Sequence, residues 1–362
     1  MALKRKLSPA PPSFKLLKLP FVALTQVLSR LGFQELYNLS TCSEKAKTVI
    51  NFVGKSPPLK IEINIRNDEK EIHVFSFKGS TVPICVWSFE ESRNTKTRGR
   101  KVRRIGGIEM DIREGHKMFE IPIFGTVPVR HMRTLTPLSR MDVAMNAVLS
   151  QLLGTFRHSE VYTVSVVLKG ISEKFQARRA LAAVTKVYGL KLEADKYTSR
   201  QDIQCLLSNI EVSECLDYGC PVSLGSSIVD KLNCSAGVVC ANSTWMRPET
   251  FWNMNCHFIE LRATIFRSED IQEFLRRWKD SERKGKIHFV EIHHPFGMNL
   301  DYEALDAKPW DPEVRPKMSP GVELYDCSSG MDIRRADGRI GIILHTTDTS
   351  LVFLVWPRNT KN

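Results

Sequence analysis

The fold of the N-terminal region is decided by the stretch Leu19-Pro-Phe-Val-Ala-Leu-Thr-Gln-Val-Leu-Ser-Arg-Leu-Gly-Phe-Gln-Glu-Leu-Tyr-Asn-Leu39. Proline suits the first turn of a helix, so Pro20 predicts a helix start. Gly32 predicts the end of that helix. Between them, four apolar residues recur with the spacing of one helix face: Leu24, Val27, Leu28 and Leu31.

Two more short helices are expected directly after this one. The spacing of a helix face repeats at Phe33, Leu36 and Tyr37, with Leu39 beside them. Ser43 is a suitable N-cap for a third helix, whose apolar face holds Ala46, Val49, Ile50 and Val53. Helices this short are marginal in isolation, and an apolar surface left over on such a unit usually meets a partner.

The order of these residues resembles the F-box, an adaptor-docking module. The resemblance rests on Leu19-Pro20, Val27-Leu28, Leu31, Glu35-Leu36, Leu39 and Cys42. Val22 and Lys45 depart from the family pattern, in which many members have Glu and Trp. The resemblance implies docking to a Skp-type adaptor through Leu19, Pro20, Val27, Leu28, Leu31, Leu36 and Leu39. The alternative is an ordinary three-helix cap on a larger domain.

The composition of the 362-residue chain is that of a soluble globular protein, with 42% hydrophobic and 25% charged residues. No apolar run is long enough to span a bilayer. Residues 1–13 lack the apolar core of a secretory signal, so we expect a disordered leader. The nine cysteines have irregular spacing without a Cys-x-x-Cys pair, which predicts reduced thiols in a cytoplasmic or nuclear protein and no metal site.

A basic segment at residues 93–107 supplies much of the net charge of +12. Such a segment can be a nuclear import signal, a nucleic-acid patch or simply a solvated loop. No aromatic residues alternate with the charges, which argues against a surface that stacks on bases. An acidic or phosphorylated target segment is a further hypothesis, with the contacts made by Arg100, Lys101, Arg103 and Arg104.

The rest of the chain is expected to be of mixed α+β or α/β class. After an F-box-like unit at residues 14–56, residues 57–170 predict a β-rich region whose strands begin with an alternating pattern at residues 59–65. Residues 171–300 alternate short strands and helices with starts about 20–30 residues apart, which favours stacked units like leucine-rich repeats. The helices near Asp202 and Asp270 have similar sequences, each preceded by a Ser suited to capping. A non-repeating α/β sheet is the alternative.

This second half also resembles the type-2 F-box-associated domain of a large nematode F-box family. The resemblance spans about residues 190–357 and rests on Ser243-Thr-Trp245, Phe251-Trp-Asn-Met-Asn-Cys256, Ile259-Glu-Leu261 and Asp270 to Trp278. Residues 301–362 would form a C-terminal cap with a β-hairpin that turns at Asp337-Gly338.

Motifs for catalysis are missing from the sequence: it has no Gly-x-Ser-x-Gly, Walker or His-Glu-x-x-His pattern. His293-His294 lacks the i, i+2 spacing of ligands on one strand face and predicts a hydrated turn. Cys220 has no neighbouring base. We therefore expect neither enzymatic activity nor a cofactor. Tryptophan is common in binding hot spots, so Trp245 and Trp252 are candidate target contacts.

These patterns favour a substrate-recognition subunit of a cullin–RING ubiquitin ligase. It would bind a Skp-type adaptor, through it a cullin, and an unidentified target protein. The sequence does not distinguish this role from a scaffold that binds the adaptor without a cullin. A basic protein associated with nucleic acid is a less favoured alternative, which the net charge alone supports.

Overall fold

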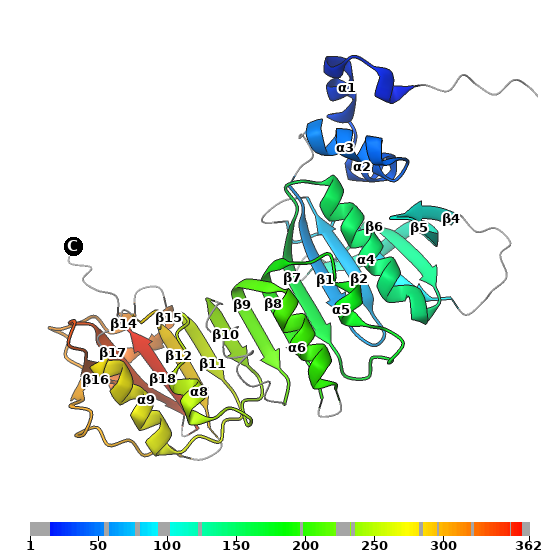
Figure 1. The fold of residues 1–362 in the computed structure, drawn as a ribbon. Helices are drawn as coiled ribbons and strands as arrows, with labels where there is room; N and C mark the ends of the chain where they lie inside the picture. The colour runs from blue at the N-terminus through cyan, green and yellow to red at the C-terminus, as the bar shows by residue number, and fades with distance from the viewer. Residues whose placement is uncertain are drawn as a thin grey trace, which may run out of the picture.

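The computed structural model describes residues 15–53, 58–76, 80–92, 102–121, 125–195, 198–221, 232, 236–281, 285–294, 297–319, 322–347 and 349–356. A small helical unit stands at one end of a long curved sheet (Figure 1). The expected leader at residues 1–13 lies outside the described residues. None of the described helices is long and apolar enough to cross a membrane.

The helical unit consists of η1 (Leu16–Lys18), α1 (Phe21–Leu28), α2 (Phe33–Ser40) and α3 (Glu44–Val53). Ser43 caps α3, because its Oγ accepts a hydrogen bond from the Ala46 amide at 3.1 Å. The prediction for Gly32 was wrong: α1 already ends at Leu28. Gly32 has an extended backbone (φ −77°, ψ 175°) and is the N-cap of α2.

Among the described residues, sixteen strands form one mixed sheet in the order β13-β16-β17-β18-β12-β11-β10-β9-β8-β7-β1-β2-β3-β6-β5-β4. The strands nearest the N-terminus of the chain form the end of the sheet that carries β4. They are β1 (Lys60–Ile65), β2 (Lys70–Phe75), β3 (Cys85–Glu91), β4 (Val102–Ile105), β5 (Ile108–Ile121), β6 (Gly125–Thr136) and β7 (Glu160–Val167). The middle holds β8 (Lys186–Glu193), β9 (Glu211–Gly219), β10 (Gly237–Cys240), β11 (Phe258–Leu261) and β12 (Phe289–His293). All neighbouring pairs from β7 to β12 are parallel.

Helices cover one face of this sheet (Figure 1). They are α4 (Leu138–Thr155), α5 (Ala177–Ala180), α6 (Arg200–Asn209), α8 (Pro248–Trp252) and α9 (Ser268–Asp280). The alternating burial of β8 shows why: Leu190 and Leu192 are buried, while Lys191 between them is exposed on the opposite face. The cap predicted at Ser268 was wrong, since Arg267 is the N-cap and its amide donates to Asp270 at 2.8 Å.

The C-terminal strands continue the sheet in antiparallel fashion. They are β13 (Lys308–Pro309), β16 (Met331–Arg334), β17 (Ile340–Thr347) and β18 (Ser350–Val355), and β18 pairs with β12. The turn between β16 and β17 contains Gly338 at φ +86°, the left-handed conformation that favours glycine. A separate hairpin, β14 (Met318–Ser319) and β15 (Val322–Asp326), leads into η2 (Cys327–Ser329).

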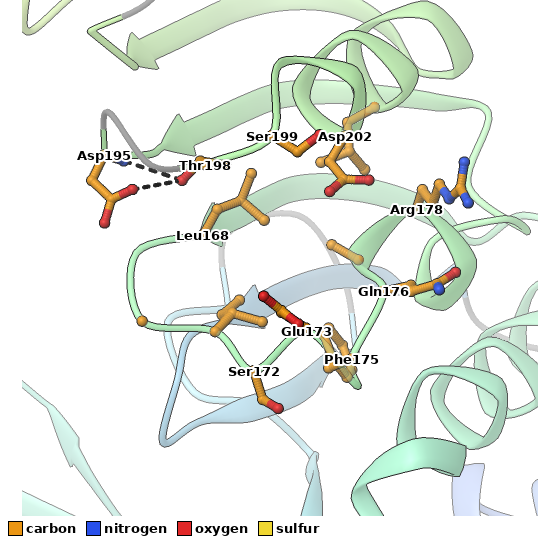
Figure 2. Close-up of a pocket in the computed structure, with 14 residues that line it drawn as sticks. Leu168, Ser172, Glu173, Phe175, Gln176, Arg178, Asp195, Thr198, Ser199 and Asp202 are labelled. Atoms are coloured by element: carbon orange, nitrogen blue, oxygen red, sulfur yellow. Dashed lines mark hydrogen bonds between the residues drawn. The ribbon is translucent and has the colours of Figure 1, made fainter.

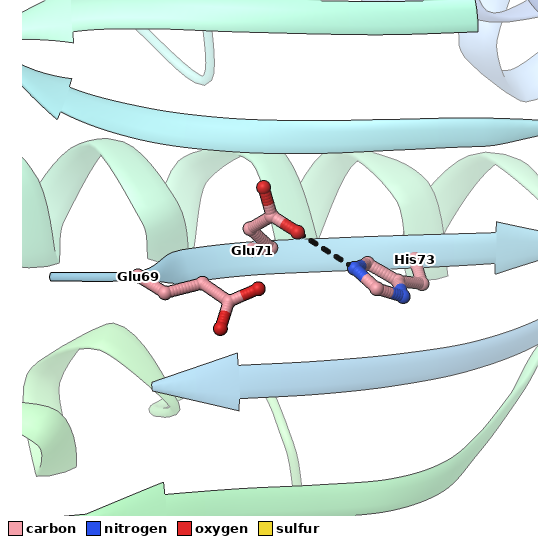
Figure 3. Close-up of side chains that lie close together, drawn as sticks. All are labelled: Glu69, Glu71 and His73. Carbon is pink, nitrogen blue, oxygen red and sulfur yellow. Dashed lines mark hydrogen bonds and ion pairs between the residues drawn. The ribbon is translucent and has the colours of Figure 1, made fainter. Parts of the chain in front are cut away.

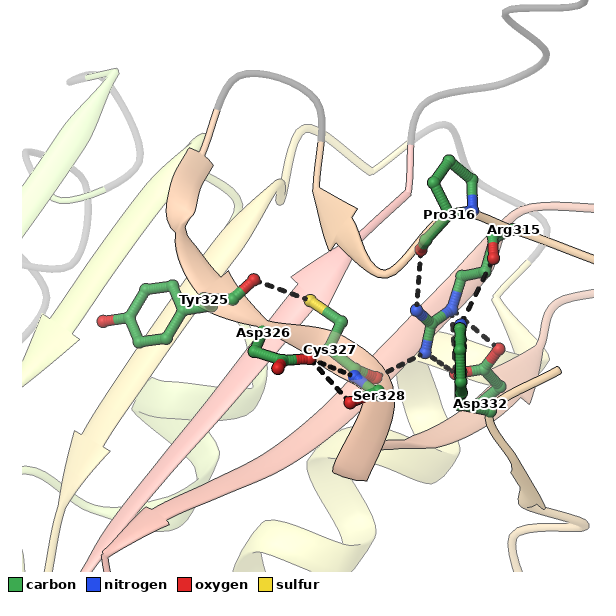
Figure 4. A network of polar contacts seen from close by, with 8 residues as sticks. Arg315, Pro316, Tyr325, Asp326, Cys327, Ser328 and Asp332 are labelled. Carbon is green, nitrogen blue, oxygen red and sulfur yellow. Dashed lines mark hydrogen bonds and ion pairs between the residues drawn. The ribbon is translucent and has the colours of Figure 1, made fainter. Parts of the chain in front are cut away.

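Arg315 fastens this C-terminal segment to the sheet (Figure 4). Its fully buried guanidinium pairs with Asp332 on β16 at 2.6 Å and donates to the Cys327 carbonyl oxygen at 3.0 Å. It also lies over the Trp356 ring, 5.3 Å from the ring centroid. Because the ion pair is bidentate and the guanidinium also donates to the carbonyl oxygens of Cys327 and Pro316, the buried charge is compensated.

The contact between α9 and the sheet leaves no room for a side chain at position 341. A Cβ atom on Gly341 would lie 2.5 Å from the Phe353 ring and 2.9 Å from Cζ3 of Trp278. Gly341→Ala should therefore lower the free energy of unfolding by about 1–3 kcal/mol, as overpacked core positions do. Chemical denaturation measures this change.

Gly115 in β5 is the matched control, because a Cβ there meets no atom within 4 Å. Gly115→Ala should leave stability within about 0.5 kcal/mol of the parent or raise it. Equal losses in both variants would contradict the packing of Trp278 against Gly341.

Candidate functional site

The helical unit exposes an apolar patch, formed by Phe21, Val22 and Val27 on α1 and Phe52 on α3. Phe52 is 77% exposed, Val22 72%, Phe21 60% and Val27 36%. The Phe21 and Phe52 rings meet edge to face with centroids 6.3 Å apart. Figure 1 places α1 on the side of the unit farthest from the sheet. Large apolar side chains this exposed indicate a surface that meets another protein.

The seven residues predicted for adaptor docking fall into two groups. Pro20 and Val27 are exposed: Val27 is part of the patch, and Pro20 directly precedes Phe21 in the chain. The others pack partly or fully inside the helical unit: Leu19, Leu28, Leu31, Leu36 and Leu39. Leu28 and Leu36 are each only 4% exposed, so they build the core that supports the patch.

Sequence reasoning missed Phe21, Val22 and Phe52 as surface residues. The sequence did contain a sign of this exposed surface, because α1 carries apolar residues on both of its sides. A helix that is apolar all round needs a second partner besides its own core. Val22, noted only as a departure from the family pattern, enlarges the exposed apolar surface.

The opposite side of the helical unit packs on the sheet domain. Tyr37 of α2 meets Trp87 of β3 edge to face with centroids 5.2 Å apart, and Phe33 packs on Phe156 with centroids 5.3 Å apart. Two hydrogen bonds also join residues more than 100 positions apart in the chain. They are Gln151 Nε2 to Ser40 Oγ and Asn51 Nδ2 to the Gly154 carbonyl, both at 2.9 Å.

The described part of the predicted basic loop is ordered structure. Residues 102–105 form β4, and Gly106 and Gly107 make the turn to β5 with positive φ angles. Arg103 donates to Asn38 of α2 at 2.8 Å and pairs with Glu114, while Arg104 pairs with Glu109 at 2.8 Å. Arg103 thus joins the sheet to the helical unit. Arg100 and Lys101 lie outside the described residues.

Trp245 and Trp252 are half-buried in the middle of the sheet domain. Trp252 donates to the Asp270 carbonyl at 2.8 Å and carries the Arg277 guanidinium 4.4 Å from its ring centroid. Trp245 meets Tyr218 edge to face at 5.6 Å. The structure does not bring these two tryptophans together with Arg103 and Arg104 in one site. Their role as target contacts stays a prediction.

The buried cysteines and His294 are parts of the core, whereas His293 is partly exposed on β12. Burial raises the pKa of the Cys220 thiol to about 12, and it does the same for Cys85, Cys240 and Cys256. Such thiols carry almost no thiolate at neutral pH. The predicted hydrated turn was wrong for His294, which is buried with its Nε2 against the Phe266 carbonyl oxygen.

Among the described residues, two groups of carboxylates and histidine have the geometry to hold a metal ion. The first is Glu69, Glu71 and His73 on and before β2 (Figure 3). There Glu71 is bound by His73 at 2.8 Å and by Lys117 at 2.7 Å. The second is Glu260, Glu291 and His293, where Arg262 lies 2.5 Å from Glu260. Since an ion would have to displace a protein cation in each group, neither supports a metal site better than an ion-pair network.

The Glu71 network makes a pH-dependent contribution to stability. Burial alone would raise the pKa of Glu71, but hydrogen bonds from His73 and Lys117 outweigh it and lower the pKa to about 2. A carboxyl with a depressed pKa stabilises the fold above its unfolded-state pKa and loses this effect as the pH falls to its folded-state pKa. Glu71→Gln should therefore cost about 2–3 kcal/mol at pH 7.

The difference between Glu71→Gln and the parent should shrink as the pH falls from about 4.5 to about 2, measured by denaturation at each pH. Glu303→Gln, at an exposed site, is the control and should change stability at neither pH. A Glu71→Gln deficit that is constant with pH would contradict an ionised, paired Glu71.

Tyr37 allows the contact between the helical unit and the sheet to be tested. Burial raises the pKa of Tyr37 well above its usual value, and its hydroxyl has no hydrogen-bond partner among the described residues. Tyr37→Phe should therefore leave the free energy of unfolding unchanged or up to about 1 kcal/mol higher. Tyr37→Ala should lower it by about 3–5 kcal/mol, since the ring is lost. A marked loss in Tyr37→Phe would show that the hydroxyl is satisfied.

Comparison with known proteins gives a family match for the helical unit. The F-box domain model matches residues 16–55, which contain η1 to α3. The Caenorhabditis elegans uncharacterized protein F59B2.8 is 22% identical over 381 residues, covering 95% of this chain and 78% of its own length. Uncharacterized protein F54H12.5 of the same organism is 25% identical over 368 residues, covering 97% and 95%. No solved structure gives a significant match.

Proposed function

We propose that this chain is the substrate-recognition subunit of an SCF-type cullin–RING ubiquitin ligase. Its F-box docks a Skp-type adaptor, and its sheet domain binds a target protein. The observation that carries the proposal is the coincidence of the F-box match at residues 16–55 with an exposed apolar patch on the same helices. The chain supplies proximity between target and ligase, and the chemistry belongs to its partners.

The apolar patch is the adaptor-docking surface in this proposal. Phe21 and Phe52 offer large aromatic surface that is already held in place by their mutual contact. Aromatic side chains dominate the energy of many protein interfaces when they enter a pocket of the partner. Among the residues that the sequence predicts for docking, Val27 belongs to this surface and Pro20 directly precedes it in the chain.

The packing of α2 and α3 on the sheet domain supports the second half of the proposal. Aromatic contacts and hydrogen bonds hold the F-box against α4 and β3, so an adaptor on the patch fixes the orientation of the sheet domain. We further propose that the parallel units within residues 171–300, from β8 to β12, are leucine-rich-repeat-like and belong to a type-2 F-box-associated domain. Target contacts would then include Trp245, Trp252, Arg100 and Lys101.

Exposed residues give the sharpest test of adaptor docking. Phe21→Ala combined with Phe52→Ala should reduce co-purification with a co-expressed Skp-type adaptor by at least about tenfold, because two hot-spot side chains are lost. Leu28→Ala is unsuitable, since Leu28 is buried and its loss would disturb the helices themselves. Size-exclusion chromatography of the co-expressed pair measures the complex.

Met118→Ala and Ile265→Ala are matched controls, because both side chains are exposed but lie on the sheet domain. Both should leave adaptor binding unchanged. Adaptor binding that survives loss of Phe21 and Phe52 would reject the patch as the docking surface. When a cullin is co-expressed with this pair, its absence from the purified complex would favour a ligase-independent scaffold.

A further inference from the structure

A cavity of about 370 Å³ opens at the carboxyl ends of β7 and β8 (Figure 2). Its walls come from the loop that follows β7, the start of α5, the loop that follows β8, and α6. In open sheets with parallel strands, the crevice beyond the carboxyl ends of the strands is the usual place for a ligand. The volume lies in the range of pockets that enclose a small ligand or a side chain.

The walls of this pocket combine an apolar lining with two carboxylates. Leu168, Phe175 and Leu206 line it with apolar surface. Glu173, from the loop after β7, and Asp202, from the first turn of α6, also line it, and Figure 2 shows both carboxylates facing the hollow. Within the described part of the chain, neither carboxylate is engaged in a side-chain hydrogen bond or an ion pair.

The charges of the described lining residues leave the pocket negative. Asp195 at the rim accepts a hydrogen bond from the Thr198 hydroxyl at 3.0 Å. Arg178 is the one cationic residue among the described lining residues, and Figure 2 shows its guanidinium directed away from Glu173. The amino end of α6 contributes about half a positive charge, which is less than the charge of the two carboxylates. A cationic group is therefore the complementary occupant.

The pocket lies at the edge of the sheet opposite to the F-box. The helical unit packs on Phe156 and Gly154, just before the start of β7 at Glu160. β7 runs away from this contact with the helical unit. The carboxyl end of β7 therefore lies one strand length from the contact, about 26 Å for eight residues. A partner bound to the F-box would leave the pocket open.

We propose that this pocket binds a lysine or arginine side chain in an exposed segment of the target protein. The inference rests on the proposed function and names the chemistry of the target. The aliphatic stem would lie along Leu168 and Phe175, and the cationic head would pair with Glu173 and Asp202. Charge-assisted hydrogen bonds to two carboxylates would make the head group the main determinant of affinity.

Capped tripeptides of the form acetyl-Gly-X-Gly-amide are the probes, titrated into the full chain with NMR or calorimetric detection. The arginine and lysine peptides should bind saturably, and the methionine and glutamate peptides at least about tenfold more weakly. The double variant Glu173→Gln with Asp202→Asn should weaken arginine and lysine binding by at least about tenfold, because both charges are lost while the shapes remain.

Glu303→Gln is the matched control and should leave peptide binding unchanged. Equal binding of all four peptides, no binding, or no effect of the double variant would each overturn the proposal. The comparison of arginine with lysine shows which head group is preferred. Adaptor co-purification is measured on the same variants and should stay intact. If the parent chain does not co-purify with the adaptor but still binds the arginine and lysine peptides, the adaptor role is rejected and the pocket is not.

Discussion

The packing of Tyr37 against Trp87 is the contact on which the relation between the two parts of the molecule depends. Trp87 is buried in β3 and donates from Nε1 to Thr134 of β6 at 2.8 Å, so its ring is fixed within the sheet. Tyr37 meets this fixed ring from α2. A short helical unit cannot bury its apolar faces alone, and here the sheet supplies the missing core on one side. The patch of Phe21, Val22, Val27 and Phe52 is what remains uncovered on the other.

The two faces of the sheet differ in how they meet their surroundings. Helices shield one face, whereas ion pairs lie on the other: Lys191 pairs with Glu193 on its own strand and with Asp217 on the neighbouring strand β9. At the C-terminal end, the segment fastened by Arg315 covers a separate apolar cluster around Phe289, Val352 and Trp356. Outside this segment, the helix-free face presents exposed charged side chains such as Lys191 to solvent.

Local patterns in the sequence predicted where helices and strands lie better than they predicted which of them pack together. The strand predicted at residues 59–65 agrees with β1 within one residue, because strict alternation of apolar and polar residues marks a half-buried strand. Gly32 was misjudged because glycine suits both a helix end and an N-cap. Arg103 was taken as a loop residue, since its partner Asn38 lies 65 positions away and no local pattern records such a contact. The exposure of Phe52 likewise depends on which helix faces the sheet.

Two surfaces at opposite edges of one packed body make a physical case for an adaptor role. Flexible attachment would leave the target free to move relative to the ligase, and much of the gain from proximity would be lost. Here the path from the apolar patch to the pocket at β7 and β8 runs only through packed elements: α1 to α3, then α4, then β7 itself. Hydrogen bonds from Gln151 and Asn51 join the helical unit to α4 at the point where the chain turns into β7. A target held at the far edge would thus keep a fixed distance from the adaptor, and strand length sets that distance.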